Sequence, residues 1–314
     1  MPAVPQRFSV IDNEIKIAAA YNQAGYRYGK YADGSGDKLF CFEGRHAYAD
    51  RKTWELIDGK LLALRAGGLH RLRVLDLGCG PGTWLRRVVV RAKQMGFTEI
   101  EAQGLDIADA QLHRARALSR NVAEMEGVTL SFRHADLRGK LPCLQSDLCL
   151  CLYSVLNHLP AGELPDALRR IGDVTTGFFV ATVRTIGSTP TVYVDDVSTA
   201  LRFYQDNQID RLDVEFTNGH RTSFQSHLFS RAELLKLAGT AFEVEEVLGL
   251  DLFHLRFAAD ARWNPPSATP LARLSQELAR LEERYCRDPG FIDHAAHLLL
   301  VARGRKEARK CTGF

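Results

Sequence analysis

The residues with the clearest chemical purpose lie in a glycine-rich stretch, DLGCGPG at 76–82. Glycine lets a backbone turn sharply and lets a ligand approach the main chain closely. The apolar run at 71–77 predicts a buried parallel strand before this stretch, and the pattern at 83–95 predicts a helix after it. A helix N-terminus carries unpaired N–H groups and the positive end of the helix dipole. The glycine-rich turn is therefore predicted to bind a ligand that carries an anionic group.

Two uses of such a turn compete. A dinucleotide-binding turn has the spacing G-x-G-x-x-G and an acidic residue about 20 residues later. In this chain the spacing is G-x-G-x-G, and Thr83 occupies the position of the third dinucleotide glycine. An acidic residue, Asp76, also precedes the glycines, and the next predicted strand reaches Asp106.

Four motifs follow one another at regular intervals: VLDLGCGPGTW at 74–84, GLDI at 104–107, HADL at 134–137 and SDLCLCLYSVLNHLP at 146–160. In this order they resemble the class I S-adenosylmethionine-dependent methyltransferases. The resemblance covers roughly residues 70–185, with a fainter match of the final strand. It is specific to the superfamily and not to any substrate, and it implies S-adenosyl-L-methionine as the cofactor.

The resemblance also implies a role for each matching residue. Asp76 would order the amino group of the cofactor, and the glycines would let its methionine and ribose parts lie against the backbone. Asp106 would accept hydrogen bonds from both ribose hydroxyls, and Asp136 resembles the position that recognises the adenine edge. The full set of predicted cofactor-binding residues is Asp76, Gly78, Cys79, Gly80, Gly82, Asp106, Ile107, Asp136, Leu137 and Leu152.

Methyl transfer from a sulfonium is an in-line displacement, so the protein mainly positions the acceptor. A general base helps where the acceptor carries a proton. By location, just past the fourth predicted strand, His158 is the best base, although it can equally pack or cap near the cofactor. The predicted catalytic residues are His158, Tyr153, Tyr26 and His227.

The acceptor is expected to meet two segments outside these motifs. The tyrosine-rich N-terminal stretch resembles a lid over the cofactor, and tyrosine faces stabilise a cationic sulfonium. The insertion after the fifth strand belongs to a class of loops that usually carries specificity. The predicted substrate-binding residues, each with ordinary packing as its alternative, are Tyr21, Tyr31, Tyr193, His254 and Arg256. Basic residues that favour an anionic acceptor, or are simply solvated, are Arg27, Lys30, Arg45 and Arg51.

Strands that alternate with helices imply a parallel sheet with right-handed crossovers. We expect an α/β fold: a Rossmann-like, mostly parallel sheet of seven strands, with an N-terminal helical lid and a hairpin-bearing insertion after the fifth strand. By resemblance, one of the last two strands runs antiparallel. The strands and helices predicted after residue 95 span 102–107, 109–125, 128–134, 146–153, 162–171, 177–183, 212–229 (a hairpin), 231–238, 243–252, 271–286 and 295–302.

The same patterns predict four parts of the chain. They are a lid at 1–70, a cofactor-binding core at 71–184, an inserted cap at 185–230, and a C-terminal part at 231–314 that completes the sheet and ends in a basic tail. We expect methyl transfer to a small-molecule acceptor at an O, N or C atom. The alternatives are an RNA methyltransferase, a non-catalytic cofactor-binding partner subunit and a nicotinamide oxidoreductase.

Composition and sequence patterns indicate which partners, compartment and metals to expect. The formal net charge of the 314 residues is only +3, and there is no appended RNA-binding motif, so we do not expect nucleic acid as a partner. No apolar run has the length of a membrane span, and the N-terminus does not resemble a signal peptide, so we expect a cytoplasmic protein. Spacings typical of metal ligands are absent, and no metal is expected. A homodimer remains open.

Overall fold

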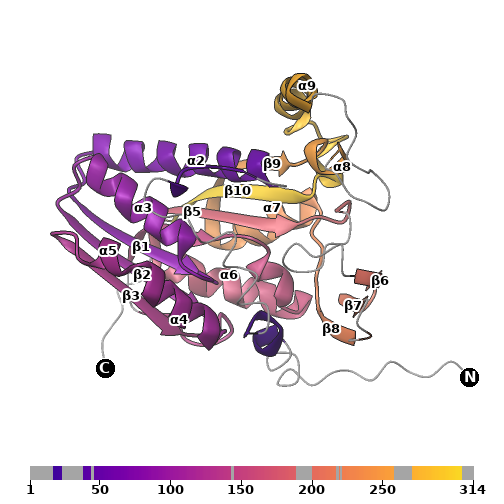
Figure 1. The fold of residues 1–314 in the computed structure, drawn as a ribbon, viewed down its shortest axis with the longest axis horizontal. Helices are drawn as coiled ribbons and strands as arrows, with labels where there is room; N and C mark the ends of the chain where they lie inside the picture. The colour runs from indigo at the N-terminus through magenta and orange to yellow at the C-terminus, as the bar shows by residue number, and fades with distance from the viewer. Residues whose placement is uncertain are drawn as a thin grey trace, which may run out of the picture.

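The computed structural model describes residues 17–22, 38–43, 46–142, 145–188, 200–216, 219, 221–257 and 271–305. At its centre is a seven-stranded sheet with the order β3-β2-β1-β4-β5-β10-β9 (Figure 1). The strands are β1 (Arg71–Leu77), β2 (Glu99–Asp106), β3 (Val128–His134), β4 (Ser146–Cys151), β5 (Thr175–Arg184), β9 (Phe242–Leu250) and β10 (His297–Gly304). The predicted fold class is confirmed.

The strand order reverses between β1 and β4, which both pair in parallel with their neighbours. Ligands of open α/β sheets bind at such a switch point, beyond the carboxyl ends of the strands. β10 runs antiparallel to β5 and β9, as expected for one of the last two strands. Its first residue, His297, is paired with the last residues of β5 and β9. The start of β10 therefore lies at the same edge as the carboxyl ends of the parallel strands.

Helices cover both faces of the sheet, and this explains why most residues of the inner strands are buried. One face packs against α2 (Ala47–Ala66), α3 (Thr83–Gln94), α4 (Asp109–Leu118) and α5 (Arg120–Ala123). The other packs against α6 (Leu164–Asp173) and α7 (Arg231–Ala241). Residues of β1 alternate between the two cores: Val74 belongs to the first, and Leu75 and Leu77 to the second.

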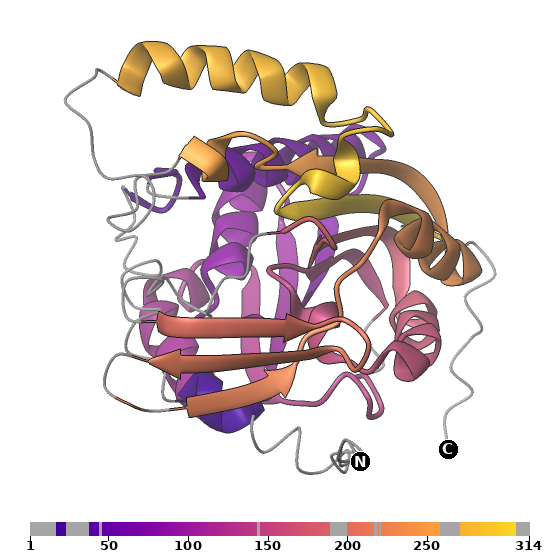
Figure 2. The same ribbon diagram turned by 90° about the vertical axis from the view of Figure 1, so that its right-hand side faces the viewer.

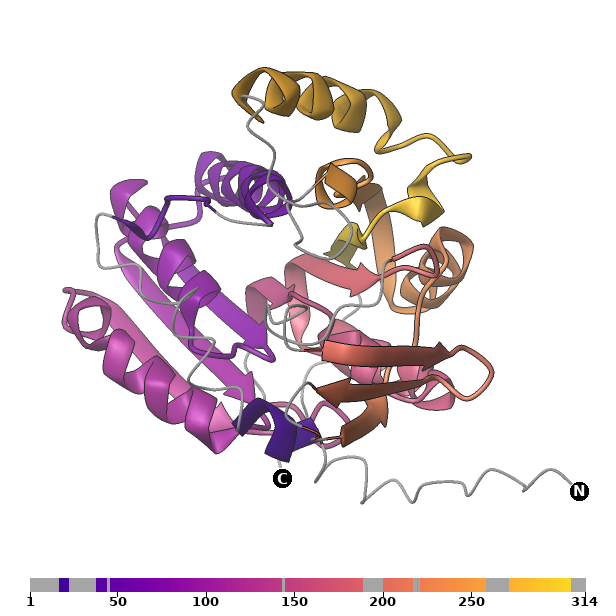
Figure 3. The same ribbon diagram turned by 45° about the vertical axis from the view of Figure 1, so that its right-hand side comes forward.

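The insertion after β5 contains a separate three-stranded antiparallel sheet (Figure 2). Its strands are β6 (Ala200–Asp206), β7 (Arg211–Phe216) and β8 (Arg221–Gln225). The predicted hairpin is β7 and β8, whereas β6 was not predicted. Ile17, from the helical turn at 17–22, completes the small core of this sheet with Leu212, Val214 and Phe224. In Figures 2 and 3 this turn, in dark indigo, lies between the small sheet and α4.

Several predicted boundaries differ from the observed ones. The strand predicted at 102–107 begins three residues earlier, at Glu99, and the strand predicted at 295–302 is His297–Gly304. The helix predicted at 109–125 is two helices, because Ser119, with φ −99° and ψ 3°, ends α4 and begins α5. Among the described residues, no helix is long and apolar enough to cross a membrane.

One buried amide joins the small sheet to the central one. Asn157 is only 1% exposed and lies in the 3₁₀ turn η2 (Val155–His158), just after β4. Its Oδ1 accepts the N–H of Arg184 at 2.9 Å, and its Nδ2 donates to the carbonyls of Arg184 and His227. The backbone carbonyl of Asn157 in turn accepts the N–H of His227 at 2.7 Å. The turn after β4, the end of β5 and the segment after β8 are thus held at one point.

We predict that Asn157→Ala lowers the free energy of unfolding by about 3 kcal/mol or more, because it removes three buried hydrogen bonds to Arg184 and His227. The free energy is measured by urea denaturation. Gln145→Ala is the matched control: it also removes an amide that donates to a backbone carbonyl, but at the surface. It should change the value by less than about 0.5 kcal/mol. Equal effects of the two variants would contradict the central role of Asn157.

Candidate active site

The glycine-rich turn after β1 has left-handed backbone at Gly78, Gly80 and Gly82. A Cβ atom at Gly78 would lie 2.3 Å from Cγ2 of Val155, so no larger residue fits there. Gly80 is different: its φ is +52°, and a Cβ atom would meet nothing within 4 Å. The backbone of Gly80 therefore faces open space, and a ligand can approach the main chain at that point.

Asp76, at the end of β1, faces the same region and is almost fully buried. Its Oδ2 has no hydrogen-bond partner among the described residues. Burial, and then the nearby charge of Asp106, raises the pKa of Asp76 to about 8. An unpaired buried carboxylate is costly, and a cationic ligand group beside it would stabilise its charged form.

Asp106, at the end of the neighbouring strand β2, holds the turn in place. Its Oδ2 accepts the N–H of Gly80 at 2.7 Å, and its Oδ1 accepts the N–H of Ala108 at 2.8 Å. Burial raises the pKa of Asp106, although these hydrogen bonds oppose the shift. Ile107, the next residue, is half-buried beside it. The carboxylates of Asp76 and Asp106 thus flank the glycine-rich turn at the ends of adjacent strands.

The remaining predicted cofactor residues follow β3 and β4. Asp136 is paired with the guanidinium of Arg138, with Nη2 and Oδ2 2.6 Å apart. Leu137 is buried in the core under α6. Leu152 is buried on the α2–α3 face of the sheet, directly before Tyr153.

The chain makes a strained turn immediately after β4. Tyr153 and Ser154 have φ values of 56° and 69°, a left-handed conformation that is uncommon outside glycine. Thr182 on β5 supports the turn, because its Oγ1 accepts the N–H of Tyr153 and its carbonyl accepts the N–H of Ser154. Strain of this kind concentrates at functional sites. The turn places the ring centroid of Tyr153 5.9 Å from that of Trp84, which lies near the start of α3.

His158 and Tyr21, predicted separately, are in contact. His158 Nδ1 lies 3.1 Å from the carbonyl of Gln225, so this nitrogen carries the proton. Nε2 then accepts a hydrogen bond from the Tyr21 hydroxyl at 2.7 Å. Burial lowers the pKa of His158 to about 4, so the imidazole is neutral at pH 7. The bond links the turn after β4 to the helical turn at 17–22.

That helical turn is also tied to α4. Gln111 Nε2 donates to the carbonyl of Tyr21, and the N–H of Ala110 donates to Oδ1 of Asn22. Residues 17–22 therefore contact both the small sheet and the segment that follows β2. Tyr26, Tyr31 and Tyr193, also predicted to act at the site, lie outside the described residues.

His227, predicted as catalytic, is held between two carboxylates. Its Nδ1 is 2.9 Å from Oδ2 of Asp210, and its Nε2 is 3.0 Å from Oε1 of Glu233. Burial lowers the pKa of His227, but both carboxylates raise it and the net shift is upward. Both ring nitrogens are engaged, so the geometry suits a link between the small sheet and α7 better than proton transfer.

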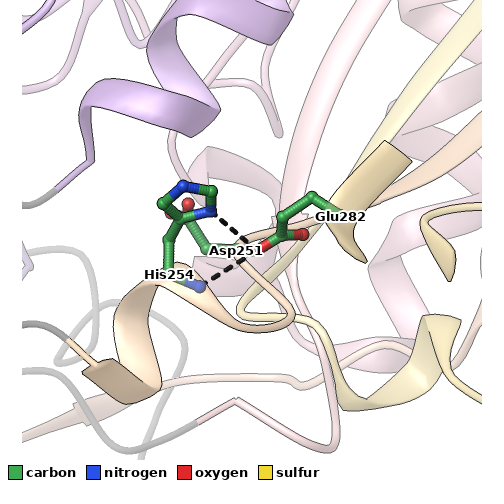
Figure 4. Close-up of side chains that lie close together, drawn as sticks. All are labelled: Asp251, His254 and Glu282. Atoms are coloured by element: carbon green, nitrogen blue, oxygen red, sulfur yellow. Dashed lines mark hydrogen bonds and ion pairs between the residues drawn. The ribbon is translucent and has the colours of Figure 1, made fainter. Parts of the chain in front are cut away.

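His254 begins the short helix α8 (His254–Phe257), which also contains Arg256. Its Nδ1 lies 3.1 Å from Oε1 of Glu282, a residue of α9 (Leu271–Tyr285), as Figure 4 shows. With Asp251, the two offer ligand atoms within 4.8 Å of one another, close enough to hold a metal ion. However, the carboxylate of Glu282 already accepts three backbone N–H groups, from residues 252–254. These hydrogen bonds explain why Glu282 is buried: its carboxylate holds the turn after β9 in place.

A further group of polar residues surrounds Tyr153, and apart from Tyr153 itself none of its members was predicted from the sequence. We call it the polar cluster: His46, Asp50, Tyr153, Asp251 and His297. Apart from Tyr153, its members come from the start of α2, the end of β9 and the start of β10. Asp251 has a left-handed φ of 57°. From the sequence, an aspartate directly after a strand predicts a turn and nothing more.

Comparison with known proteins places this geometry in a family. Residues 74–177 match the methyltransferase domain family. The structure is similar to that of an S-adenosylmethionine-dependent methyltransferase from Clostridium acetobutylicum (TM-score 0.51, 12% identity, 90% of this chain and 98% of that one). It is also similar to the cyclase SpnF (TM-score 0.52, 16% identity, 93% of this chain and 96% of that one). At these identities the two structures establish the fold alone. No curated protein matches the sequence.

The matched region begins in β1 and ends in β5, and it includes the glycine-rich turn, both flanking aspartates and the strained turn after β4. The family and the fold agree on an enzyme with S-adenosyl-L-methionine as its cofactor. The residues that form the site thus carry a methyltransferase domain, in a fold similar to that of an S-adenosylmethionine-dependent methyltransferase.

Proposed function

We propose that the protein transfers a methyl group from S-adenosylmethionine to a small-molecule acceptor. The observation that carries this proposal is the orphaned carboxylate oxygen of Asp76 beside the open side of Gly80. A cationic amino group would satisfy that oxygen, and an extended ligand would lie along the glycine backbone. When bound, the cofactor supplies a methyl group that its sulfonium has already activated.

The cofactor contacts are proposals for individual residues. Asp76 would pair with the amino group, the glycine-rich turn with Cys79 would line the methionine and ribose, and Asp106 would accept the ribose hydroxyls. Asp106 already accepts the N–H groups of Gly80 and Ala108, and its two oxygens have further acceptor capacity for a ribose hydroxyl. Ile107, Asp136, Leu137 and Leu152 would border the adenine and the sulfonium.

Positioning supplies most of the rate enhancement in such a displacement. The chain's own contribution is to hold the acceptor in line and to exclude water. Trp84 and Tyr153 present aromatic rings 5.9 Å apart near the glycine-rich turn, where they can stabilise a sulfonium. We propose that the helical turn at 17–22 and the small sheet close the site on the side of α4.

His158 is proposed as a positioning residue rather than a base. One ring nitrogen is used by Gln225 and the other by Tyr21, so the imidazole joins three segments of the chain. Tyr21 would accordingly act as the latch that holds the N-terminal helical turn over the cofactor. An RNA acceptor or a non-catalytic role is not favoured by any contact among the residues that the structure describes.

Asp76→Asn should affect cofactor binding and stability in opposite directions. Loss of the charge should weaken binding of S-adenosylhomocysteine roughly 10–100-fold by calorimetry. Because the folded-state pKa of about 8 exceeds the ordinary 3.8, ionisation opposes folding increasingly as pH rises between these values. The variant should therefore unfold at a higher temperature than the wild type at pH 8 and lose this advantage near pH 4.

The wild type provides the reference for this test. S-adenosylhomocysteine should raise its melting temperature and NAD should not, since a ligand that binds only the native state stabilises it by mass action. A response to NAD alone would contradict the proposed function. A variant that binds S-adenosylhomocysteine like the wild type would contradict the role of Asp76 only.

Tyr21→Phe should increase the dissociation rate of S-adenosylhomocysteine roughly 5–10-fold, since it removes one hydrogen bond that holds the helical turn in place, worth about 1 kcal/mol. The melting temperature without ligand should change little, because the ring still packs against the small sheet. Stopped-flow displacement measures the rate. Tyr204→Phe, on an exposed tyrosine of the same small sheet, is the control. Unchanged dissociation in Tyr21→Phe would exclude the latch.

A further inference from the structure

The polar cluster brings together residues from both ends of the chain at the carboxyl edge of the sheet. The ring of His297 lies 6.2 Å from that of Tyr153 and 6.1 Å from that of His46. His46 Nδ1 is in turn 3.7 Å from Oδ2 of Asp251. Asp50, one turn further along α2, interacts electrostatically with both His46 and Asp251.

Several polar atoms of this cluster are buried and make no hydrogen bond, although His46 Nδ1 and Oδ2 of Asp251 face each other as an ion pair. The atoms without a hydrogen bond among the described residues are His46 Nδ1, Asp50 Oδ1, Tyr153 Oη, both carboxylate oxygens of Asp251 and His297 Nδ1. Buried polar groups in native proteins are nearly always paired, and each exception needs an explanation. Six such atoms in one cluster are explained together by a ligand that carries the complementary groups.

The charges of the cluster define that ligand. Burial raises the pKa of Asp50 to about 6 and raises that of Asp251, to which buried Glu282 also contributes. His297 is neutral, because burial lowers its pKa to about 3. Arg87 and His46 oppose the shift at Asp50, His46 and His254 oppose it at Asp251, and Arg184 acts on His297. The guanidinium of Arg87 also lies over the rings of Phe42 and Trp84 and donates to the carbonyl of Leu39. Because burial is the largest cause at both Asp50 and Asp251, their carboxylates stay incompletely neutralised.

The cluster also adjoins the cofactor side of the site. Trp84 is the second residue of α3, which begins directly after Gly82. Its ring contacts Tyr153, which itself belongs to the cluster. A molecule held by Asp50 and Asp251 would therefore lie next to the aromatic pair that we place at the sulfonium.

We propose that the polar cluster is the acceptor site and that the acceptor is an amine. This inference rests on the proposed function. Asp50 and Asp251 would bind the ammonium form through its N–H groups, and one carboxylate would take a proton to release the nitrogen lone pair. The nitrogen lone pair then forms the N–CH₃ bond as the S–CH₃ bond breaks, and the electron pair of the broken bond stays on sulfur. The product is a methylammonium, which keeps the positive charge.

This inference departs from the anionic acceptor expected from the sequence. Of the four basic residues behind that expectation, only Arg51 is described, and its side chain is exposed to solvent. The expectation came from charges in a sequence segment, whereas the amine follows from buried carboxylates that lie beside one another in the fold.

The test compares three probes of one shape: benzylamine, benzyl alcohol and benzoate. Each is titrated by calorimetry into the full-length protein saturated with S-adenosylhomocysteine. Benzylamine should bind at least 10-fold more tightly than the other two. Asp251→Asn and Asp50→Asn should each weaken benzylamine binding at least 10-fold, whereas Asp166→Asn, a surface aspartate paired with Arg169, should not change it. Both cluster variants should also melt at higher temperature than the wild type, since each removes an unpaired buried carboxylate.

Methyl transfer gives a second readout. With labelled S-adenosylmethionine, benzylamine should accept the label, and the two cluster variants should reduce kcat/KM at least 10-fold without changing the affinity for S-adenosylhomocysteine. Stronger binding of benzoate or benzyl alcohol, or no binding of benzylamine, would overturn the inference while leaving the proposed function intact. So would a rise in melting temperature with zinc or magnesium that is lost in Asp251→Asn. Failure to bind S-adenosylhomocysteine would instead overturn the proposed function.

Discussion

The contact on which the site most depends is the buried amide of Asn157. Its side-chain oxygen and nitrogen bond to the end of β5 and to the segment after β8. The next residue, His158, can reach Gln225 and Tyr21 only because this turn is fixed against β5 and the segment after β8. The central sheet thus positions the small sheet and the helical turn at 17–22 through the amide of Asn157. This group is neutral, so its hydrogen bonds do not change with pH.

Charged residues at the same edge behave in the opposite way. Asp76, Asp50 and Asp251 are buried carboxylates whose pKa values are raised mainly by burial, and at Asp50 the charge of Arg87 offsets this only in part. Each lowers the stability of the protein without ligand at neutral pH. Such a cost is typical of binding sites, where the free protein is strained or unpaired and the bound ligand relieves it. The neutral contacts hold the framework, and the charged ones are left for the ligands.

The sequence predicted the parts of this structure that local patterns determine. Strands such as β1 and β4 are mostly buried because both faces of the sheet are covered, and the spacing of the glycines predicts the turn after β1. The polar cluster could not be predicted, because His46 and His297 are far apart in the sequence and meet only through the antiparallel placement of β10. The contacts of His227 with Asp210 and Glu233 could not be predicted either, because neither carboxylate is adjacent to it in sequence.

The position of β10 has a consequence for how the protein is made. This strand lies between β5 and β9, so the sheet cannot close until residues 297–304 have left the ribosome. Until then β5 exposes an unpaired edge, and β9 has no strand to join. The first half of the sheet, β3-β2-β1-β4-β5, can form during synthesis because its contacts are local βαβ units. The second half, with the start of β10 that contributes His297, must follow once residues 297–304 have been made. The nascent protein would therefore form the glycine-rich turn and its flanking strands well before the polar cluster, and truncation before residue 297 would leave the former without the latter.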